Sequence, residues 1–407
     1  MSEAVKEREH ALLSASSAHK WLYCTPSARL EASLPDQAGK AAEEGTLAHA
    51  ICELKLSRLF TDRNMSTRTY NSRMKKLQKD PLYDPEMERF TDEYVEYVKE
   101  LAYAMSQAPT LMIEKRLDYG EWAQGGFGTG DCVMLQGNAL HIIDFKYGKG
   151  VPVSAEGNPQ LALYALGALH EFGFIYPVEQ VTLHIVQPRI KNTSNWTTTR
   201  KELLAWGDYV KAKAELAYKG EGDFVEGKYC DSCFCKIAGT CRKRAENNLA
   251  LMEKAWDQET NRPVDPATLS DEEVGQILKD AQYLASWVKK LEAYALGTLV
   301  SGGEIPGWKL VEGRSNRSFT DTDAAIRAAV SAGYDEALFY ERKPVTLTEA
   351  EKIISKDVWA SVISPYVEKP PGKPTLAPAD DKRPVYSVKP SAMEAFGGCN
   401  EYKEVKQ

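Results

Sequence analysis

Two aspartates and a lysine stand where neighbouring apolar segments begin or end. Asp131 precedes the run "CVML", and Asp144 closes the run "LHII", with Lys146 two residues later. If residues 130–136 and 140–146 pair as antiparallel strands, the two carboxylates approach each other across the sheet, and Lys146 shares a face with Asp144. Two close carboxylates repel unless a cation lies between them, and Mg²⁺ or Mn²⁺ suits their oxygens. The pattern therefore predicts a metal site.

A metal held by carboxylates beside an ammonium group is suited to phosphodiester hydrolysis. The ammonium of Lys146 can position or help deprotonate a water, or stabilise negative charge that develops on a phosphate. The simpler interpretation is an ion pair between Asp144 and Lys146 at a strand end, and the triplet Asp-Phe-Lys taken alone favours it.

Hydrophobic periodicity predicts the elements that would carry these residues. Four segments rich in β-branched residues predict strands over 111–119, 128–136, 140–148 and 181–189. Helical spacing predicts one helix over 86–105 and another over 157–173, and the second lies between two strands as in a crossover connection. Capping boxes at Ser270–Glu273 and Thr348–Glu351 predict the start of a long helix ending at Val300 and of a later helix.

The cysteines form a second candidate site. Cys230, Cys233, Cys235 and Cys241 crowd into one short segment, and the N-terminal sequence "MSEAVKEREHALLSASS" is too charged for a secretory signal. Four thiolates this close in a reducing compartment predict a metal or iron–sulfur site, although a chance cluster of buried thiols is the alternative. Cys52 and Cys132 are most simply buried thiols.

Composition limits the classes of partner. The formal net charge of −7 lends no support to nucleic-acid binding, but it does not exclude it, because local fields decide contacts. No apolar run reaches the length of a membrane span, so we expect no membrane partner. Together with the charged N-terminus this predicts a cytoplasmic protein.

The wider constellation resembles the PD-(D/E)XK nuclease superfamily, with Asp144 in the middle acidic position. "GTLAHAICE" is similar to a helix of the RecB-like exonuclease branch that supplies a histidine ligand, here His49. "QLALYA" matches that branch's Gln-x-x-x-Tyr motif through Gln160 and Tyr164, and Glu114 stands where the family has an acid on the preceding strand. The resemblance implies an α/β fold with a restriction-endonuclease-like core, a mixed central sheet flanked by helices, and a mainly helical C-terminal region.

The resemblance also implies roles for these residues. The metal would be held by His49, Asp131, Asp144 and the backbone carbonyl of Phe145. The catalytic residues would be Asp131, Asp144, Lys146, Glu114, Gln160 and Tyr164. Glu53, one helical turn after His49, could orient the histidine or a metal-bound water.

Iron–sulfur members of this branch join one N-terminal cysteine to three that follow the nuclease core. Cys24 and the segment from Cys230 to Cys241 are similar to that layout, which implies a structural cluster, most simply [4Fe–4S]. The family commonly spaces the three as C-x2-C-x5-C. Cys230 and Cys233 keep the first gap, whereas Cys235 and Cys241 keep the second, so the sequence leaves open which of Cys233 and Cys235 is spare. Zinc also accepts such thiolates.

We therefore expect three regions: a nuclease domain over 1–260, a helical or α+β accessory domain over 261–367, and a flexible tail over 368–407. The whole chain also resembles phage and prophage proteins with an uncharacterised C-terminal region, which implies the bacterial host cytoplasm if the chain is phage-encoded. The expected function is a Mg²⁺- or Mn²⁺-dependent deoxyribonuclease in phage-type recombination or DNA end processing. The branch that the chain resembles favours an exonuclease over an endonuclease. A recombination protein is a candidate partner besides DNA. Candidate DNA contacts are Arg189, Trp196, Arg314 and Arg317.

Two other functions stay open. One is a non-catalytic DNA-binding or scaffold component that retains the nuclease fold. The other is a zinc-binding regulator, which leaves the two aspartates and His49 unexplained.

Overall fold

The computed structural model describes residues 11–34, 39–253, 256–257, 262–263, 270–281, 283–311, 321–333, 335–340, 350 and 358–367. The chain divides into two units, residues 1–309 and 310–407. The boundary predicted near residue 260 falls inside the first unit, and independent folding of residues 1–260 stays a prediction. The capping box of Thr348 and Glu351 and the tail predicted from residue 368 lie outside the described residues.

A five-stranded sheet forms the centre of the first unit. Its strands, in spatial as well as chain order, are β1 (Thr110–Asp118), β2 (Phe127–Gln136), β3 (Ala139–Phe145), β4 (Gln180–Gln187) and β5 (Asn192–Thr199). All neighbours are antiparallel except β3 and β4, which are parallel and are joined by the crossover helix α6 (Pro159–Phe172). The predicted mixed sheet flanked by helices is thus confirmed.

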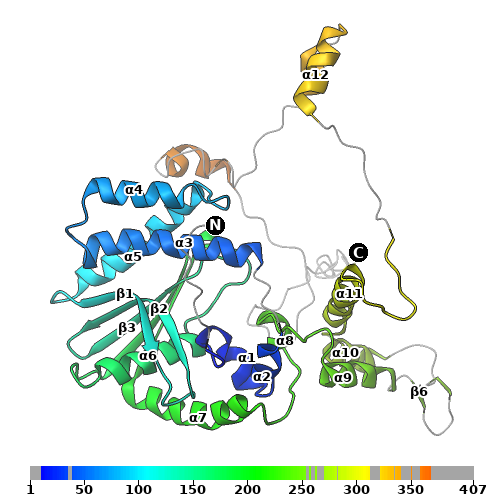
Figure 1. Ribbon diagram of the computed structural model, residues 1–407, viewed down its shortest axis with the longest axis horizontal. Helices are drawn as coiled ribbons and strands as arrows, with labels where there is room; N and C mark the ends of the chain where they lie inside the picture. The colour runs from blue at the N-terminus through cyan, green and yellow to red at the C-terminus, as the bar shows by residue number, and fades with distance from the viewer. Residues whose placement is uncertain are drawn as a thin grey trace, which may run out of the picture. The chain divides into compact units, whose positions relative to one another are not determined.

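Apolar side chains of the strands point alternately to the two faces of this sheet, so both faces need covering. Helices pack on each of them (Figure 1). Ile142 packs toward α6 and α7 (Arg200–Lys219). Its neighbour Ile143 packs on the other face, in the core shared with α3 (Lys40–Leu56), α4 (Thr67–Leu77) and α5 (Glu86–Ala104). The helix predicted over 86–105 is confirmed by α5.

The strand register sets three acidic residues in one row. The last β2–β3 pair is Cys132 with Ile143, so the next step sets Asp131 opposite Asp144. On its other side β2 pairs with β1 immediately before and after Glu114, which therefore stands level with Asp131. The predicted pairing of the segments that carry the two aspartates is confirmed, and the short turn at residues 137–138 enforces it.

Further helices and strands complete the two units. They are α1 (Ala18–Tyr23), α2 (Ser27–Ala32), α8 (Tyr229–Ser232), α9 (Arg242–Glu253), β6 (Trp256–Asp257), β7 (Arg262–Pro263), α10 (Asp271–Asp280), α11 (Leu284–Val300) and α12 (Thr322–Ser331). Short 3₁₀ or π turns lie at Ala15–Ser17, Ser57–Thr61, Pro188–Ile190, Glu336–Phe339, Trp359–Ile363 and Ser364–Tyr366. Among the helices described, none combines the length and hydropathy that a membrane span requires.

The single long helix predicted from residue 271 to Val300 is wrong. α10 begins after Ser270 as predicted, but it ends at Asp280, and α11 starts at Leu284. The reason is tertiary: the Arg244 guanidinium donates to the Tyr283 carbonyl (3.3 Å), and the Trp287 indole donates to the Gly239 carbonyl (3.0 Å). These contacts direct α11 onto the segment from Cys230 to Cys241, here called the cysteine segment.

Candidate metal centre

His49 on α3 meets two acids of the sheet. Its Nδ1 lies 3.3 Å from Oδ1 of Asp131 on β2 and 3.9 Å from Oε1 of Glu114 on β1. One ligand atom from each of the three residues lies within 4.8 Å of the other two. An imidazole and two carboxylates are a donor set that Mn²⁺ accepts readily and that Mg²⁺ can share with water. The residues present thus fit a divalent cation.

Backbone geometry brings Glu114 to this position. Its φ is +48°, in the left-handed region that non-glycine residues rarely adopt. The ladder holds it there, because the residues on both sides of it pair normally with β2. Strained residues that the surrounding structure over-determines are found preferentially at functional sites.

The Asp131 carboxylate is held by both of its oxygens. Oδ2 accepts a hydrogen bond from the Phe145 backbone N–H (2.7 Å), while Oδ1 faces His49. The His49 ring also meets the Phe145 ring edge-on, with centroids 5.3 Å apart. Phe145 therefore positions the centre through its N–H and its ring, and the ligand role predicted for its carbonyl stays a prediction.

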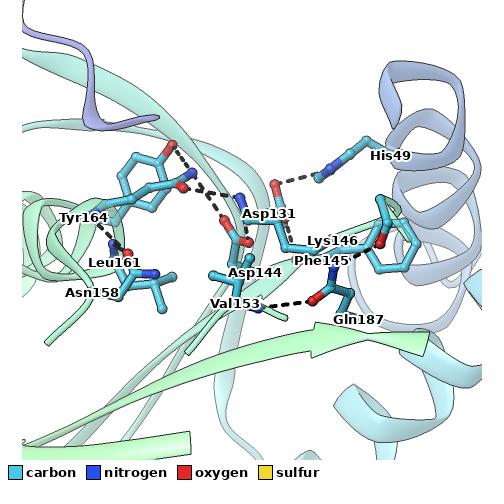
Figure 2. A network of polar contacts seen from close by, with 12 residues as sticks. His49, Asp131, Asp144, Phe145, Lys146, Val153, Asn158, Leu161, Tyr164 and Gln187 are labelled. Carbon is cyan, nitrogen blue, oxygen red and sulfur yellow. Dashed lines mark hydrogen bonds and ion pairs between the residues drawn. The ribbon is translucent and has the colours of Figure 1, made fainter. Parts of the chain in front are cut away.

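Four of the predicted residues form one polar network beside this centre (Figure 2). Asp144, only 2% exposed, has its Oδ2 3.0 Å from Nζ of Lys146. The Gln160 amide nitrogen donates to Oδ1 of Asp144 (3.2 Å) and to the Tyr164 hydroxyl (3.3 Å), and its oxygen accepts from Lys146 (3.1 Å). In Figure 2, His49 and Tyr164 approach the two aspartates from opposite sides.

Asp144 is poised for a cation. Its Oδ2 is buried and, beyond the ion pair with Lys146, accepts no hydrogen bond from any described residue. Lys146 is thus the cationic partner of this buried oxygen, and a metal ion could add a second one. Asp144 does not belong to the group of three that His49, Glu114 and Asp131 form. Its predicted role as a ligand stays a prediction.

Burial and charge shift the pKa values of these groups in opposite directions. Burial alone would lower the pKa of His49, but Asp131, Asp144 and Glu114 raise it to about 9. Burial would raise the pKa of Asp131, but His49 and Lys146 hold it below its ordinary value. Burial raises the pKa of Asp144 to about 6 despite Lys146, because Asp131 also repels its charge. Without a metal, an imidazolium and an ammonium thus balance part of the negative charge of the acids.

Two positioning residues were missed by the sequence reasoning. Asn158 caps α6 and accepts the backbone N–H of Gln160 (3.0 Å), and its place before a proline is a readable helix-start signal. Gln187 at the end of β4 is 2% exposed, donates to the Gly148 carbonyl (2.8 Å) and accepts from the Val153 N–H (3.2 Å). It holds the loop that follows Lys146, and nothing in the sequence marks it.

Two of the four predicted DNA contacts, Arg189 and Trp196, lie in the described part of the chain. The Arg189 guanidinium lies over the Tyr147 ring, 4.4 Å from its centroid, and 3.9 Å from the Glu44 carboxylate. Trp196 on β5 is partly buried against the core that α6 and α7 share, and Glu53 is exposed on α3. Arg314 and Arg317 lie outside the described residues.

The cysteine segment encloses a separate small cavity. Its lining includes Lys20, Tyr23 and Tyr229 and four cysteines: Cys24, Cys230, Cys235 and Cys241. Cys24 ends α1, so this cavity joins the start of the chain to the segment that follows α7. The resemblance to iron–sulfur members of the RecB-like branch implied that junction, and the structure brings four of the thiols to one cavity.

Comparison with known proteins places the chain without assigning an activity. Residues 10–384 match a family described as "Protein of unknown function (DUF2800)". Among solved structures, the chain is similar to one described as "Crystal structure of SSO0001", with 12% sequence identity over 60% of this chain and 90% of that chain. The TM-score of that match is 0.25, too low to carry an argument about fold.

Proposed function

We propose that this chain, which belongs to the DUF2800 family of proteins of unknown function, is a divalent-metal-dependent deoxyribonuclease. The observation that supports this most is the meeting of His49, Glu114 and Asp131 beside a buried aspartate that is paired with Lys146. The choice of DNA as substrate, and of an exonuclease in recombination or end processing, rests on the resemblance to RecB-like members of the PD-(D/E)XK superfamily.

Three residues of the candidate metal centre would bind the cation. His49, Glu114 and Asp131 would hold the cation, with Asp144 as the further ligand that the resemblance implies; the cation would polarise the phosphate and acidify a bound water. The neighbouring acids raise the pKa of His49 to about 9, so a cation held there would have to take the place of the imidazolium proton. Glu114, which the resemblance implied as a catalytic residue, is thus proposed as a ligand as well, because it lies in the group of three with His49 and Asp131.

Lys146 has a separate role. Its ammonium is kept charged by Asp144 and Asp131, which raise its pKa against the effect of burial. Gln160 of α6 accepts a hydrogen bond from the Lys146 ammonium and donates one to Asp144, so it holds the ammonium in place. The positive charge would thus be preorganised for the negative charge that develops on a phosphate. Tyr164 and Gln160 orient this pair and do not themselves carry charge.

The test is cleavage of end-labelled linear and circular DNA with Mn²⁺, Mg²⁺ or EDTA. Lys146→Ala should lower the rate about a hundredfold or more, as the loss of one preorganised donor does. Lys149→Ala is the matched control, because that lysine is exposed three residues later. Cleavage of linear but not circular DNA would indicate an exonuclease. Activity that persists in EDTA, or equal rates for the wild type and Lys146→Ala, would refute the proposed site.

We also propose that the cysteine cavity holds a structural iron–sulfur cluster. The residues fit such a group, because four thiols from two distant segments line one cavity. The cluster would join α1 to the segment after α7 and would take no part in bond cleavage.

A further inference from the structure

Five cysteines stand close to the cysteine cavity, but they do not all face it. Cys24, Cys230, Cys235 and Cys241 line it, and Cys233 does not. Cys233 instead has its Sγ 3.8 Å from the Ser232 hydroxyl, at the end of the single turn α8. The cavity thus separates two cysteines that stand only two positions apart.

The residue between them explains the separation. Phe234 has a φ of +50°, a left-handed conformation that a bulky residue adopts only at a cost, and its side chain is 84% exposed. A left-handed residue after a helical turn reverses the direction of the chain. The reversal leaves Cys233 on the α8 side of the turn and carries Cys235 into the cavity.

Contacts with α1 and α2 hold the reversal in place. Glu31, 8% exposed, accepts the Lys236 backbone N–H (2.9 Å), and the Lys236 ammonium donates to the Leu34 carbonyl (3.2 Å). Lys20 pairs with Glu31 (2.5 Å) and donates to the Cys233 carbonyl (3.4 Å). The backbone on both sides of Phe234 is therefore tied to the N-terminal helices, so exchanging Cys233 for Cys235 would require breaking these contacts.

We infer that Cys235, together with Cys24, Cys230 and Cys241, supplies the thiolates of the cysteine site, and that Cys233 is a free thiol. This assignment rests on the cluster proposed above. It gives the spacing C-x4-C-x5-C in place of the family's common C-x2-C-x5-C. The two additional residues between the first and second ligands belong to the turn in which Phe234 reverses the direction of the chain.

Two measurements test the assignment on the full chain purified without oxygen. The first is the iron, sulfide and zinc content and the visible absorption of Cys233→Ser, Cys235→Ser and, as a reference for a lost ligand, Cys241→Ser. We expect Cys233→Ser to keep the metal content of the wild type, and Cys235→Ser to lose it as fully as Cys241→Ser. The second is brief alkylation of the folded wild type, followed by mass spectrometry. Of the five cysteines, only Cys233 should be modified.

The outcomes separate this inference from the proposals it rests on. Metal lost from Cys233→Ser, or kept by Cys235→Ser, would overturn the assignment, and so would protection of Cys233 in the alkylation, a readout that does not depend on any variant folding. Because zinc is measured in the same samples, the assignment is judged on whichever metal the wild type carries. A wild type without metal would overturn it together with the cluster, whereas the nuclease proposal is judged separately by the Lys146→Ala assay.

Discussion

Mild acid should destabilise the sheet through His184, a buried histidine that takes no part in the candidate metal centre. On β4, its Nδ1 lies 2.8 Å from the Tyr97 hydroxyl of α5, and its Nε2 lies 3.0 Å from Nδ1 of His141 on β3. Burial, and to a smaller extent His141, lower the pKa of His184 to about 3. The folded chain therefore keeps this ring neutral in mild acid, whereas the unfolded chain protonates it near its ordinary pKa of about 6.5.

The sign and size of the effect follow from proton linkage. Between the two pKa values the unfolded state binds more protons, so this contribution to stability is complete above about pH 6.5 and is lost as the pH falls toward 3. For one such site, the free energy of unfolding should fall by about 2 kcal/mol between pH 7 and pH 5. Burial also lowers the pKa of His141, so its contribution has the same sign.

Urea unfolding, followed by tryptophan fluorescence at pH 7 and pH 5, measures this effect in the wild type and in His184→Gln. The glutamine does not titrate, and any packing lost in the variant costs the same free energy at both pH values. The loss of unfolding free energy between pH 7 and pH 5, compared between the wild type and the variant, therefore measures the contribution of His184 protonation. The wild type should lose about 2 kcal/mol more than His184→Gln. His170→Gln, at an exposed histidine of α6, should behave as the wild type. Equal losses in the wild type and His184→Gln would refute the reasoning.

Two further predictions concern Glu114 and α11. Glu114→Gly removes the left-handed strain and one carboxylate of the acidic row, so it should raise the metal-free stability by about 1 kcal/mol and weaken Mn²⁺ binding. Thermal unfolding with and without Mn²⁺ measures both effects, and a variant that is stabilised equally by Mn²⁺ would exclude Glu114 as a ligand. Ending the chain after Thr260 removes α10 and α11 and exposes the fully buried Arg244, whereas ending it after Val311 keeps both helices. The shorter chain should therefore unfold at a lower temperature, and equal midpoints would show that α11 does not stabilise the cysteine segment.

Local chemistry in the sequence predicted much of this molecule. The helical period of residues 86–105, the β-branched runs and the short turn before β3 act over a few residues, so they specify α5 and the β2–β3 pairing directly. Because that turn also sets the register, the facing of Asp131 and Asp144 could be predicted from spacing alone. The cap and proline that start α6 likewise lie next to each other in the chain.

Only the tertiary structure decided the features that depend on contacts between distant segments. The left-handed Glu114 is held by the strand beside it, and the left-handed Phe234, which selects Cys235 over Cys233, is held by contacts from α1 and α2. α11 separates from α10 where the buried Arg244 of α9 donates to the carbonyl of Tyr283, the residue that precedes α11. Each conformation is unfavourable or neutral for the residue itself, so no local pattern encodes it. It persists because contacts far along the chain compensate for its cost.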